Sequence, residues 1–162
     1  MTGGAAVSTR TVRLPTLQHT LRFGRALGKR LTAGDLVLLS GSLGAGKTTL
    51  TKGIGAGMGV TGTITSPTFV LARVHSSATG SVPLVHVDAY RLAGTVELDD
   101  LDLDTDLTAA AVVVEWGEGI AEQLSQERLI VHLSRRQDDA RVAVLTAVGI
   151  TWAARMAELS AG

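Results

Sequence analysis

The residues from 41 to 50 read GSLGAGKTTL, with the Gly-x-x-x-x-Gly-Lys-Thr spacing of a phosphate-binding loop. In such a loop the glycines let backbone N–H groups turn inward around phosphate oxygens, and the following helix N-terminus adds partial positive charge. We expect Lys47 to reach the β- and γ-phosphates and the Thr48 hydroxyl to bind magnesium. The predicted nucleotide-binding residues of the loop and first helical turn are Gly41, Ser42, Leu43, Gly44, Ala45, Gly46, Lys47, Thr48 and Thr49.

The loop needs a strand before it and a helix after it, and the sequence predicts both. The apolar run at 36–40 is bounded by turn signals and is typical of a strand buried on both faces of a parallel sheet. Apolar residues at helical spacing follow the loop: Leu50, Ile54 and Met58. Glycines at 53, 55 and 57 weaken this helix by up to ~1 kcal/mol each, which indicates close packing or mobility there. This context disfavours the alternative of a glycine-rich turn that binds nothing.

Two other apolar runs end in a carboxylate, at Asp88 in VHVD and at Glu115 in VVVE. Both acids would stand at the carboxyl end of a strand, where ligands bind in α/β sheets. A phosphate-bound magnesium ion is usually held by an acid from a neighbouring strand. Asp88 and Glu115 are therefore candidate metal ligands and, with Lys47, candidate catalytic residues. The alternative for each is a strand-end acid that only caps a turn or a helix.

The remaining patterns predict a mixed α/β fold. An amphipathic pattern from 16 to 31 predicts a helix capped by Thr16, with Leu17, Leu21, Gly24, Leu27 and Leu31 on one face. The other expected elements are a short strand at 11–14, hairpins from 69–75 with 82–88 and from 128–134 with 140–148, a buried strand at 109–116 and a helix at 150–160. Together they predict a three-layer phosphate-loop NTPase-like fold, with a mostly parallel sheet extended by antiparallel hairpin strands. We expect a mobile tail over 1–10 and a single domain over 11–162.

Composition excludes several classes of function. The 162 residues include 15 basic and 15 acidic side chains, and this balance argues against direct binding to DNA or bare RNA. The chain has no cysteine, so disulfides, thiol chemistry and cysteine zinc sites are excluded. The N-terminus lacks the apolar region of a signal peptide, and no apolar run reaches the ~20 residues that span a bilayer. We therefore expect a cytoplasmic protein that does not bind membranes.

Four blocks of the sequence, GSLGAGKTTL, SPTF, HVDAYRL and VVVEWGE, occur in the order and spacing of the TsaE family. That family is the ATPase component of bacterial tRNA threonylcarbamoyladenosine biosynthesis. The blocks span residues 41 to 118, and the N-terminal helix and C-terminal hairpin also fit. The phosphate loop alone is generic, whereas the other three blocks together are specific. The chain thus resembles TsaE proteins over nearly its whole length.

The resemblance implies roles around the γ-phosphate. It places Thr48 and Glu115 at magnesium, with Asp88 close to the γ-phosphate or to a metal-bound water. It places Trp116 near the nucleotide. It also makes TSPTF, which contains Thr68, a switch-like loop beside the γ-phosphate.

The resemblance also implies a base pocket between the segment around Leu17 and the C-terminal hairpin loop. That loop contains Arg135 and Arg136. Arg136 is the candidate nucleotide ligand in this loop. Which of the two arginines stacks on adenine stays open. The family usually has Asp after the first loop glycine, where this chain has Ser42, so the charge of that acid is missing here.

The implied function is a magnesium-dependent ATPase that binds ATP and ADP. It drives or resets the TsaB–TsaD complex, in which TsaD transfers the threonylcarbamoyl group to adenosine in tRNA. Contact with tRNA would be indirect, through that complex, and hydrolysis by the chain alone would be slow.

Three other functions compete with this one. A GTPase is excluded because the chain has no Asn for an Asn-Lys-x-Asp motif and no Asp-x-x-Gly switch. A small-molecule kinase stays an alternative, with only the Arg pair at 135–136 as a possible lid. A nucleotide-sensing module without hydrolysis is disfavoured by the second strand-end acid.

Several polar residues have simpler interpretations. The acidic run at 97–106 is typical of a solvated helix face, and Tyr90 with Arg91 fits packing or a surface ion pair as well as a functional role. The strand histidines lack metal-ligand spacing, and we expect structural roles for them: His75, His86 and His132.

Overall fold

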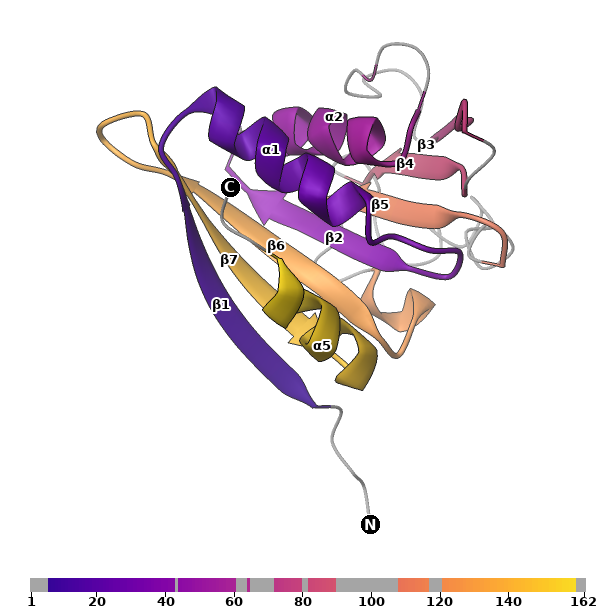
Figure 1. The fold of residues 1–162 in the computed structure, drawn as a ribbon. Helices are drawn as coiled ribbons and strands as arrows, with labels where there is room; N and C mark the ends of the chain where they lie inside the picture. Colours follow the sequence, from indigo (N-terminus) through magenta and orange to yellow (C-terminus); the bar gives the residue numbers. More distant parts are fainter. Residues whose placement is uncertain are drawn as a thin grey trace.

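The computed structural model describes residues 6–42, 44–60, 64, 72–79, 82–89, 108–116 and 121–159 (Figure 1). Its strands are β1 (Val7–Leu14), β2 (Leu36–Gly41), β3 (Ala72–His75), β4 (Leu84–Asp88), β5 (Ala111–Glu115), β6 (Arg128–Arg135) and β7 (Arg141–Val148). Its helices are α1 (Leu17–Gly28), α2 (Lys47–Gly57) and α5 (Ile150–Glu158), with a 3-10 turn, η1 (Glu122–Leu124). No helix in this described part is long and apolar enough to cross a membrane.

The described strands form one sheet of seven, in the order β1-β7-β6-β2-β5-β4-β3. Strand β2 lies between β6 and β5 and is parallel to both, and β4 is parallel to β5. Antiparallel pairs extend both edges: β7 and then β1 beyond β6, and β3 beyond β4. The predicted mixed α/β fold and both predicted hairpins are confirmed.

The central strands are buried on both faces. Every residue of β2 and β5 is buried, which explains why their sequences are continuous apolar runs rather than alternating ones. One hydrophobic cluster joins a face of the sheet to α1, α2 and α5, which lie on the same side in Figure 1. A second cluster lies on the opposite face, with the described cover provided by Ala121 and Leu124 at η1. The prediction of a strand buried on both faces at 36–40 is confirmed.

Helices α1 and α2 touch through their backbones at glycines. A Cβ added at Gly24 would lie 2.6 Å from the carbonyl oxygen of Leu50, and one at Gly53 would lie 2.5 Å from that of Leu21. A Cβ at Gly57 would be equally close to the backbone of α1. Glycine is therefore required for this approach, and close packing rather than mobility explains the glycines of α2. The packing fixes the first turn of α2, where the phosphate loop ends.

The N-terminal region differs from its prediction. Strand β1 begins at Val7, which pairs with Val148, so residues 7–10 belong to the sheet and not to a mobile tail. The polar residues at 8–10 hid this strand, because an edge strand buries little of its side chains.

Helix α1 confirms its predicted cap and part of its predicted face, since Gly24 and Leu27 are buried and Leu17 is not. The hydroxyl of Thr16 accepts a hydrogen bond from the His19 N–H at 3.3 Å. Leu17 is 60% exposed, and the buried residues of the helix are Thr20, Phe23, Gly24, Leu27 and Gly28. The buried face follows the glycines because they must meet α2, and this turns Leu17 away from the core.

Candidate functional site

The glycine-rich loop joins the end of β2 to the start of α2. Gly41, Gly44 and Gly46 have φ values of +137°, +79° and +105°, which L side chains rarely adopt. At Gly41 an added Cβ would also lie 2.4 Å from the carbonyl oxygen of Leu133 in β6. The loop conformation therefore depends on glycine at the two motif positions, Gly41 and Gly46, and also at Gly44, which the motif does not specify. Leu43 lies outside the described residues.

The first turn of α2 presents backbone donors at the end of this loop. Gly46 is the N-cap residue and makes no side-chain capping bond. The first hydrogen bond of the helix runs from the Leu50 N–H to the Gly46 carbonyl at 2.9 Å. The N–H groups of the residues between them, Lys47, Thr48 and Thr49, consequently have no acceptor within the helix. A helix N-terminus of this kind is suited to an anion such as phosphate.

Lys47 lies across the loop and is only 6% exposed. Its Nζ donates to the carbonyl oxygens of Gly41 at 2.8 Å and of Ser42 at 2.9 Å. Burial lowers the pKa of Lys47, and the negative charges of Glu115 and Asp88 oppose that shift. Ser42 contributes its backbone carbonyl here, so the loop keeps this contact without the acid that the family usually has.

Asp88 and Glu115 end neighbouring parallel strands and are paired in register. They share a sheet face with Leu84 and Val113, because side chains two residues apart on a strand point the same way. Leu84 and Val113 belong to the cluster that packs under α1 and α2. Both acids therefore face the side of the sheet that carries Lys47, and each ends a strand as predicted from the sequence.

Glu115 is 3% exposed and has a buried partner. Nε2 of His86, which is fully buried on β4, lies 2.6 Å from its Oε2. Donation to a carboxylate requires the proton on Nε2, and the other ring nitrogen, Nδ1, has no hydrogen-bond partner in the described part of the chain. His86 was expected to be a plain structural residue, and the structure instead places it directly behind a candidate metal ligand.

The donors at this edge of the sheet fit magnesium. Asp88, Glu115 and the Thr48 hydroxyl offer oxygen atoms, which Mg²⁺ prefers. The described residues contain no cluster of three or more His, Cys, Asp or Glu side chains that could hold a metal by themselves. Mg²⁺ usually keeps several waters and shares its coordination with phosphate groups, so a small set of protein oxygens suits it.

Trp116 follows Glu115 and turns back toward the loop. Its φ is +63°, unusual for a bulky residue, and its N–H donates to the Leu39 carbonyl at 2.9 Å. The centroid of its ring lies 4.0 Å from Nζ of Lys47, a cation–π contact. The structure therefore brings Trp116 to the loop lysine, where the resemblance implied a residue near the nucleotide.

A cavity of about 350 Å³ opens beside the loop. It is lined by Pro15, Thr16, Leu17, Thr20, Gly46, Thr49, Arg135, Asp139 and Arg141. This is the place between the Leu17 segment and the C-terminal hairpin where the resemblance implied a base pocket. The exposed Leu17 side chain supplies an apolar wall there.

Arg135, and not Arg136, lines this cavity. Arg136 lines another cavity together with Arg13. The reason is local: Arg135 ends β6, and the next residue starts the turn, in which the Arg136 N–H donates to the Ala140 carbonyl at 2.8 Å. The sequence-based assignment of Arg136 to the nucleotide site therefore differs from its position in the structure.

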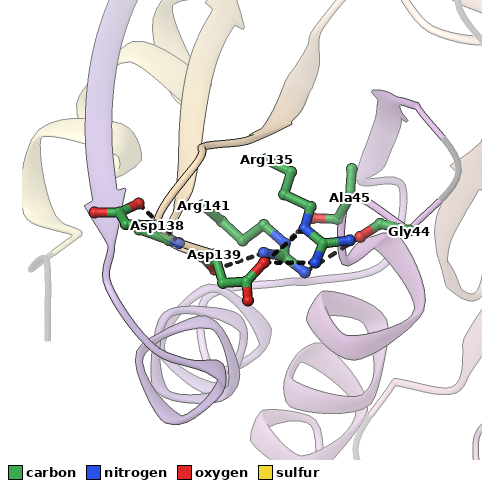
Figure 2. A network of polar contacts seen from close by, with 7 residues as sticks. Gly44, Ala45, Arg135, Asp138, Asp139 and Arg141 are labelled. Carbon is green, nitrogen blue, oxygen red and sulfur yellow. Dashed lines mark hydrogen bonds and ion pairs between the residues drawn. The ribbon is translucent and has the colours of Figure 1, made fainter.

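Arg141, the first residue of β7, was missed by the sequence analysis. Its Nε donates to the Ala45 carbonyl at 3.0 Å and its Nη2 to the Gly44 carbonyl at 3.3 Å (Figure 2). The hairpin pattern could have placed Arg141 opposite Arg135, with which it pairs. Nothing in the pattern reveals that β6 lies beside β2, which is what brings Arg141 to the loop.

Some predicted features lie outside the described residues. These are Thr68 with the TSPTF segment, Tyr90, Arg91 and the acidic run at 97–106.

The fold and the loop define the class of protein: an α/β domain in which a glycine-rich loop joins a central parallel strand to a helix. The family model described as "Threonylcarbamoyl adenosine biosynthesis protein TsaE" matches residues 14–143. The chain belongs to the TsaE family, which is involved in tRNA threonylcarbamoyladenosine biosynthesis.

Individual relatives agree with this assignment. The chain is 54% identical to the TsaE protein of Streptomyces coelicolor over 144 residues, which cover 86% of this chain and 97% of that one. It is 44% identical to the TsaE protein of Bacillus subtilis over 128 residues, with 78% of each chain covered. Among solved structures, YdiB of Bacillus subtilis matches with a TM-score of 0.78 and 33% identity, over 95% of each chain.

Proposed function

We propose that this chain is a magnesium-dependent ATPase that binds ATP and ADP at the loop from 41 to 49. The observation that carries the proposal is the pairing of Asp88 with Glu115 at the ends of adjacent parallel strands, both near enough to Lys47 to affect its pKa. A site that only binds a nucleotide does not need two strand-end acids beside the phosphate lysine. Such a pair is suited to holding a metal ion and orienting a water molecule.

The loop and α2 supply the phosphate contacts in this proposal. Backbone N–H groups of the loop and of the first helical turn donate to phosphate oxygens. The ammonium group of Lys47 exchanges the carbonyls of Gly41 and Ser42 for the β- and γ-phosphates. This exchange replaces two neutral acceptors with charged ones, and hydrogen bonds to charged groups are roughly twice as strong.

The acids and Thr48 supply the catalytic environment. Thr48 and Glu115 would hold magnesium, with His86 fixing one carboxylate oxygen of Glu115 and leaving the other free. The ion, when bound, neutralises charge on the β- and γ-phosphates. Asp88, at the paired position of the next strand, holds and orients the attacking water or a metal-bound water.

The base and ribose lie in the cavity of about 350 Å³ beside the loop. Leu17 offers an apolar contact for a base face, and the guanidinium of Arg135 offers a flat surface on which adenine can stack. The missing guanine motif of GTPases in the sequence favours ATP over GTP.

Family membership supports the biological role. We propose that ATP hydrolysis drives or resets the TsaB–TsaD complex in the cytoplasm and that tRNA meets this chain only through that complex. The switch-like segment TSPTF would respond to the γ-phosphate, so ATP and ADP would differ in their effect on the partner. A tenfold preference needs only ~1.4 kcal/mol of differential binding free energy.

The test measures ATP binding and ATP hydrolysis with and without TsaB–TsaD. Lys47→Ala should lose most nucleotide affinity, and Glu115→Gln should bind nucleotide yet lose most of its turnover. Lys52→Ala, which removes an exposed lysine of the same helix, is the matched control and should behave like wild type. Unchanged ATP binding in Lys47→Ala contradicts the proposed site. Turnover that depends on a small metabolite rather than on TsaB–TsaD would favour a small-molecule kinase, and binding without any turnover would favour a nucleotide-sensing module.

A further inference from the structure

Arg141 lies half-buried between the phosphate loop and the tip of the β6–β7 hairpin. Figure 2 shows its guanidinium facing the loop, where Nε donates to Ala45 and Nη2 to Gly44. On the other side Nη1 donates to the backbone carbonyl of Asp139 at 2.6 Å. All three hydrogen bonds are to backbone carbonyl oxygens, so the arginine orients peptide groups.

The orientation of these peptides decides what the loop can bind. In a trans peptide the C=O and N–H groups point in opposite directions. Arg141 holds the carbonyls of Gly44 and Ala45 toward itself. The N–H groups of the same two peptide units belong to Ala45 and Gly46, and they therefore point away from β7. The Ala45 N–H accordingly donates back across the loop to the Ser42 carbonyl at 3.1 Å. The Ala45 amide is thus used within the loop, and the Gly46 amide remains beside the helix N-terminus, where backbone donors suit an anion.

Gly44 has little other support, although its neighbour Ala45 is anchored by its buried side chain. A Cβ added at Gly44 would meet no atom of the described residues within 4 Å. Glycine has the largest conformational freedom of any residue, and Gly44 and Gly46 flank the two peptides that Arg141 holds. Without the arginine, these peptides would sample other orientations, and a ligand would have to restrict them on binding.

The β6–β7 hairpin anchors the side chain of Arg141. Arg141 pairs with Arg135 at the end of the antiparallel ladder, and two like charges directly opposite each other repel. Asp139 relieves this repulsion, because its carboxylate accepts two hydrogen bonds from Arg135, at 2.9 and 2.5 Å, while its backbone carbonyl accepts from Arg141. The side chain of Arg141 is therefore held at both the hairpin and the loop.

We propose that Arg141 is a positioning residue that preorganises the Gly44–Gly46 segment of the phosphate loop for polyphosphate. The proposal rests on the proposed nucleotide binding and adds a role for a side chain that need not touch phosphate. It competes with one specific alternative, because Arg141 also lines the base cavity and could instead contact the base.

Two ligands separate these roles: ADP, which has a base, and tripolyphosphate, which has none. Calorimetry would compare wild type with Arg141→Met and Arg141→Lys. We expect Arg141→Met to weaken the affinity for ADP and for tripolyphosphate by the same factor, about tenfold. This factor corresponds to ~1.4 kcal/mol, close to the free energy of one charge-assisted hydrogen bond. Arg141→Lys should recover only part of this affinity, since an ammonium group lacks the planar fork that reaches Ala45, Gly44 and Asp139 through three separate nitrogens. Arg13→Met, which removes an exposed arginine outside the site, is the control for lost charge and should leave both affinities unchanged.

Amide hydrogen exchange without ligand gives a second readout. Peptides that cover residues 44–46 should exchange faster in Arg141→Met than in wild type, while peptides from β2 and β5 should not change. Loss of ADP affinity with normal tripolyphosphate affinity would mean that Arg141 contacts the base, and it overturns the proposal. Unchanged amide hydrogen exchange of residues 44–46 in Arg141→Met also overturns the proposal, even if that variant is less stable than wild type. If wild type binds neither ligand, the proposed function fails, and the exchange experiment still decides whether Arg141 orders the loop.

Discussion

Nε2 of His86 and Oε2 of Glu115 lie 2.6 Å apart in the interior, on adjacent strands, with both side chains almost inaccessible to solvent. The contact is diagonal in the sheet, because His86 pairs with Val113 and Glu115 follows two residues later on the same face. One carboxylate oxygen of Glu115 therefore accepts the hydrogen bond from His86. In the proposed site the other oxygen would hold a ligand in front of Lys47, and the imidazole would set the direction in which it points.

Replacing His86 should therefore affect both stability and the magnesium-dependent part of nucleotide binding. His86→Leu leaves Glu115 buried without its donor, at a cost of roughly 1–3 kcal/mol in unfolding free energy. His86→Gln keeps an N–H donor near the Nε2 position and should lose much less. Urea denaturation gives the first quantity, and ADP titrations with and without magnesium give the second. Equal magnesium dependence in wild type and His86→Leu would show that the histidine does not orient Glu115.

The glycine contact between α1 and α2 yields a prediction with an internal control. Gly53→Ala places a methyl group 2.5 Å from the Leu21 carbonyl, a backbone atom that cannot move without shifting α1. Gly55→Ala, on the same helix, meets instead the flexible end of the Ile64 side chain. Alanine favours a helix over glycine by up to ~1 kcal/mol, so propensity alone predicts stabilisation in both variants. We expect Gly53→Ala to be destabilised by about 2 kcal/mol or more, because overpacking outweighs propensity, and Gly55→Ala to be affected much less.

Thermal unfolding of the two glycine variants would check this expectation. Equal melting temperatures for Gly53→Ala and Gly55→Ala would mean that the helices can separate without cost. Tripolyphosphate affinity provides a further readout, because movement of α1 against α2 also displaces the helix N-terminus that follows the loop.

His75 predicts a pH dependence of stability. Burial lowers the pKa of this histidine, and the nearby His86 and Arg73 lower it further. The unfolded chain then binds a proton at a higher pH than the folded one does. This contribution to stability is complete above the ordinary histidine pKa of about 6.5 and declines as the pH falls toward the folded value.

Urea denaturation between pH 8 and pH 5 would measure that dependence. The unfolding free energy of wild type should fall more steeply toward acid than that of His75→Leu, which has no proton to bind. Parallel curves for the two proteins would contradict the prediction.

Local sequence patterns predicted the helices and strands well, but they did not predict which elements lie side by side. The apolar runs at 36–40 and 109–116 identified buried strands because strands covered on both faces have no polar alternation. The loop glycines were predictable because only glycine readily adopts their backbone conformation. Strand order depends on contacts between distant segments, and for that reason the approach of Arg141 to Gly44 and the diagonal contact of His86 with Glu115 were not predicted. The exposure of Leu17 was missed because the glycines of α1, rather than its leucines, decide which face meets α2.

The cation–π contact between Lys47 and Trp116 makes phosphate binding visible by fluorescence. The chain has two tryptophans. Trp152 is buried under Arg155, whose guanidinium lies 4.0 Å from its ring centroid, far along the chain from the loop. When a polyphosphate draws the Lys47 ammonium away from its 4.0 Å contact with Trp116, the local field at that indole changes, and its emission should change with it.

Tripolyphosphate or ADP should therefore alter the emission of wild type and of Trp152→Phe, which retains only Trp116. The change should vanish in Trp116→Phe. Lys47→Ala supplies the decisive comparison, because it keeps both indoles and removes the charge that moves. Its emission should differ from wild type before any ligand is added and should stay constant at ligand concentrations that saturate wild type. Adenosine, which has no phosphate, should leave the wild-type signal unchanged. A full response of Lys47→Ala at saturating ligand would mean that Trp116 senses the ligand directly, and the movement of Lys47 from the loop carbonyls to phosphate would then be wrong.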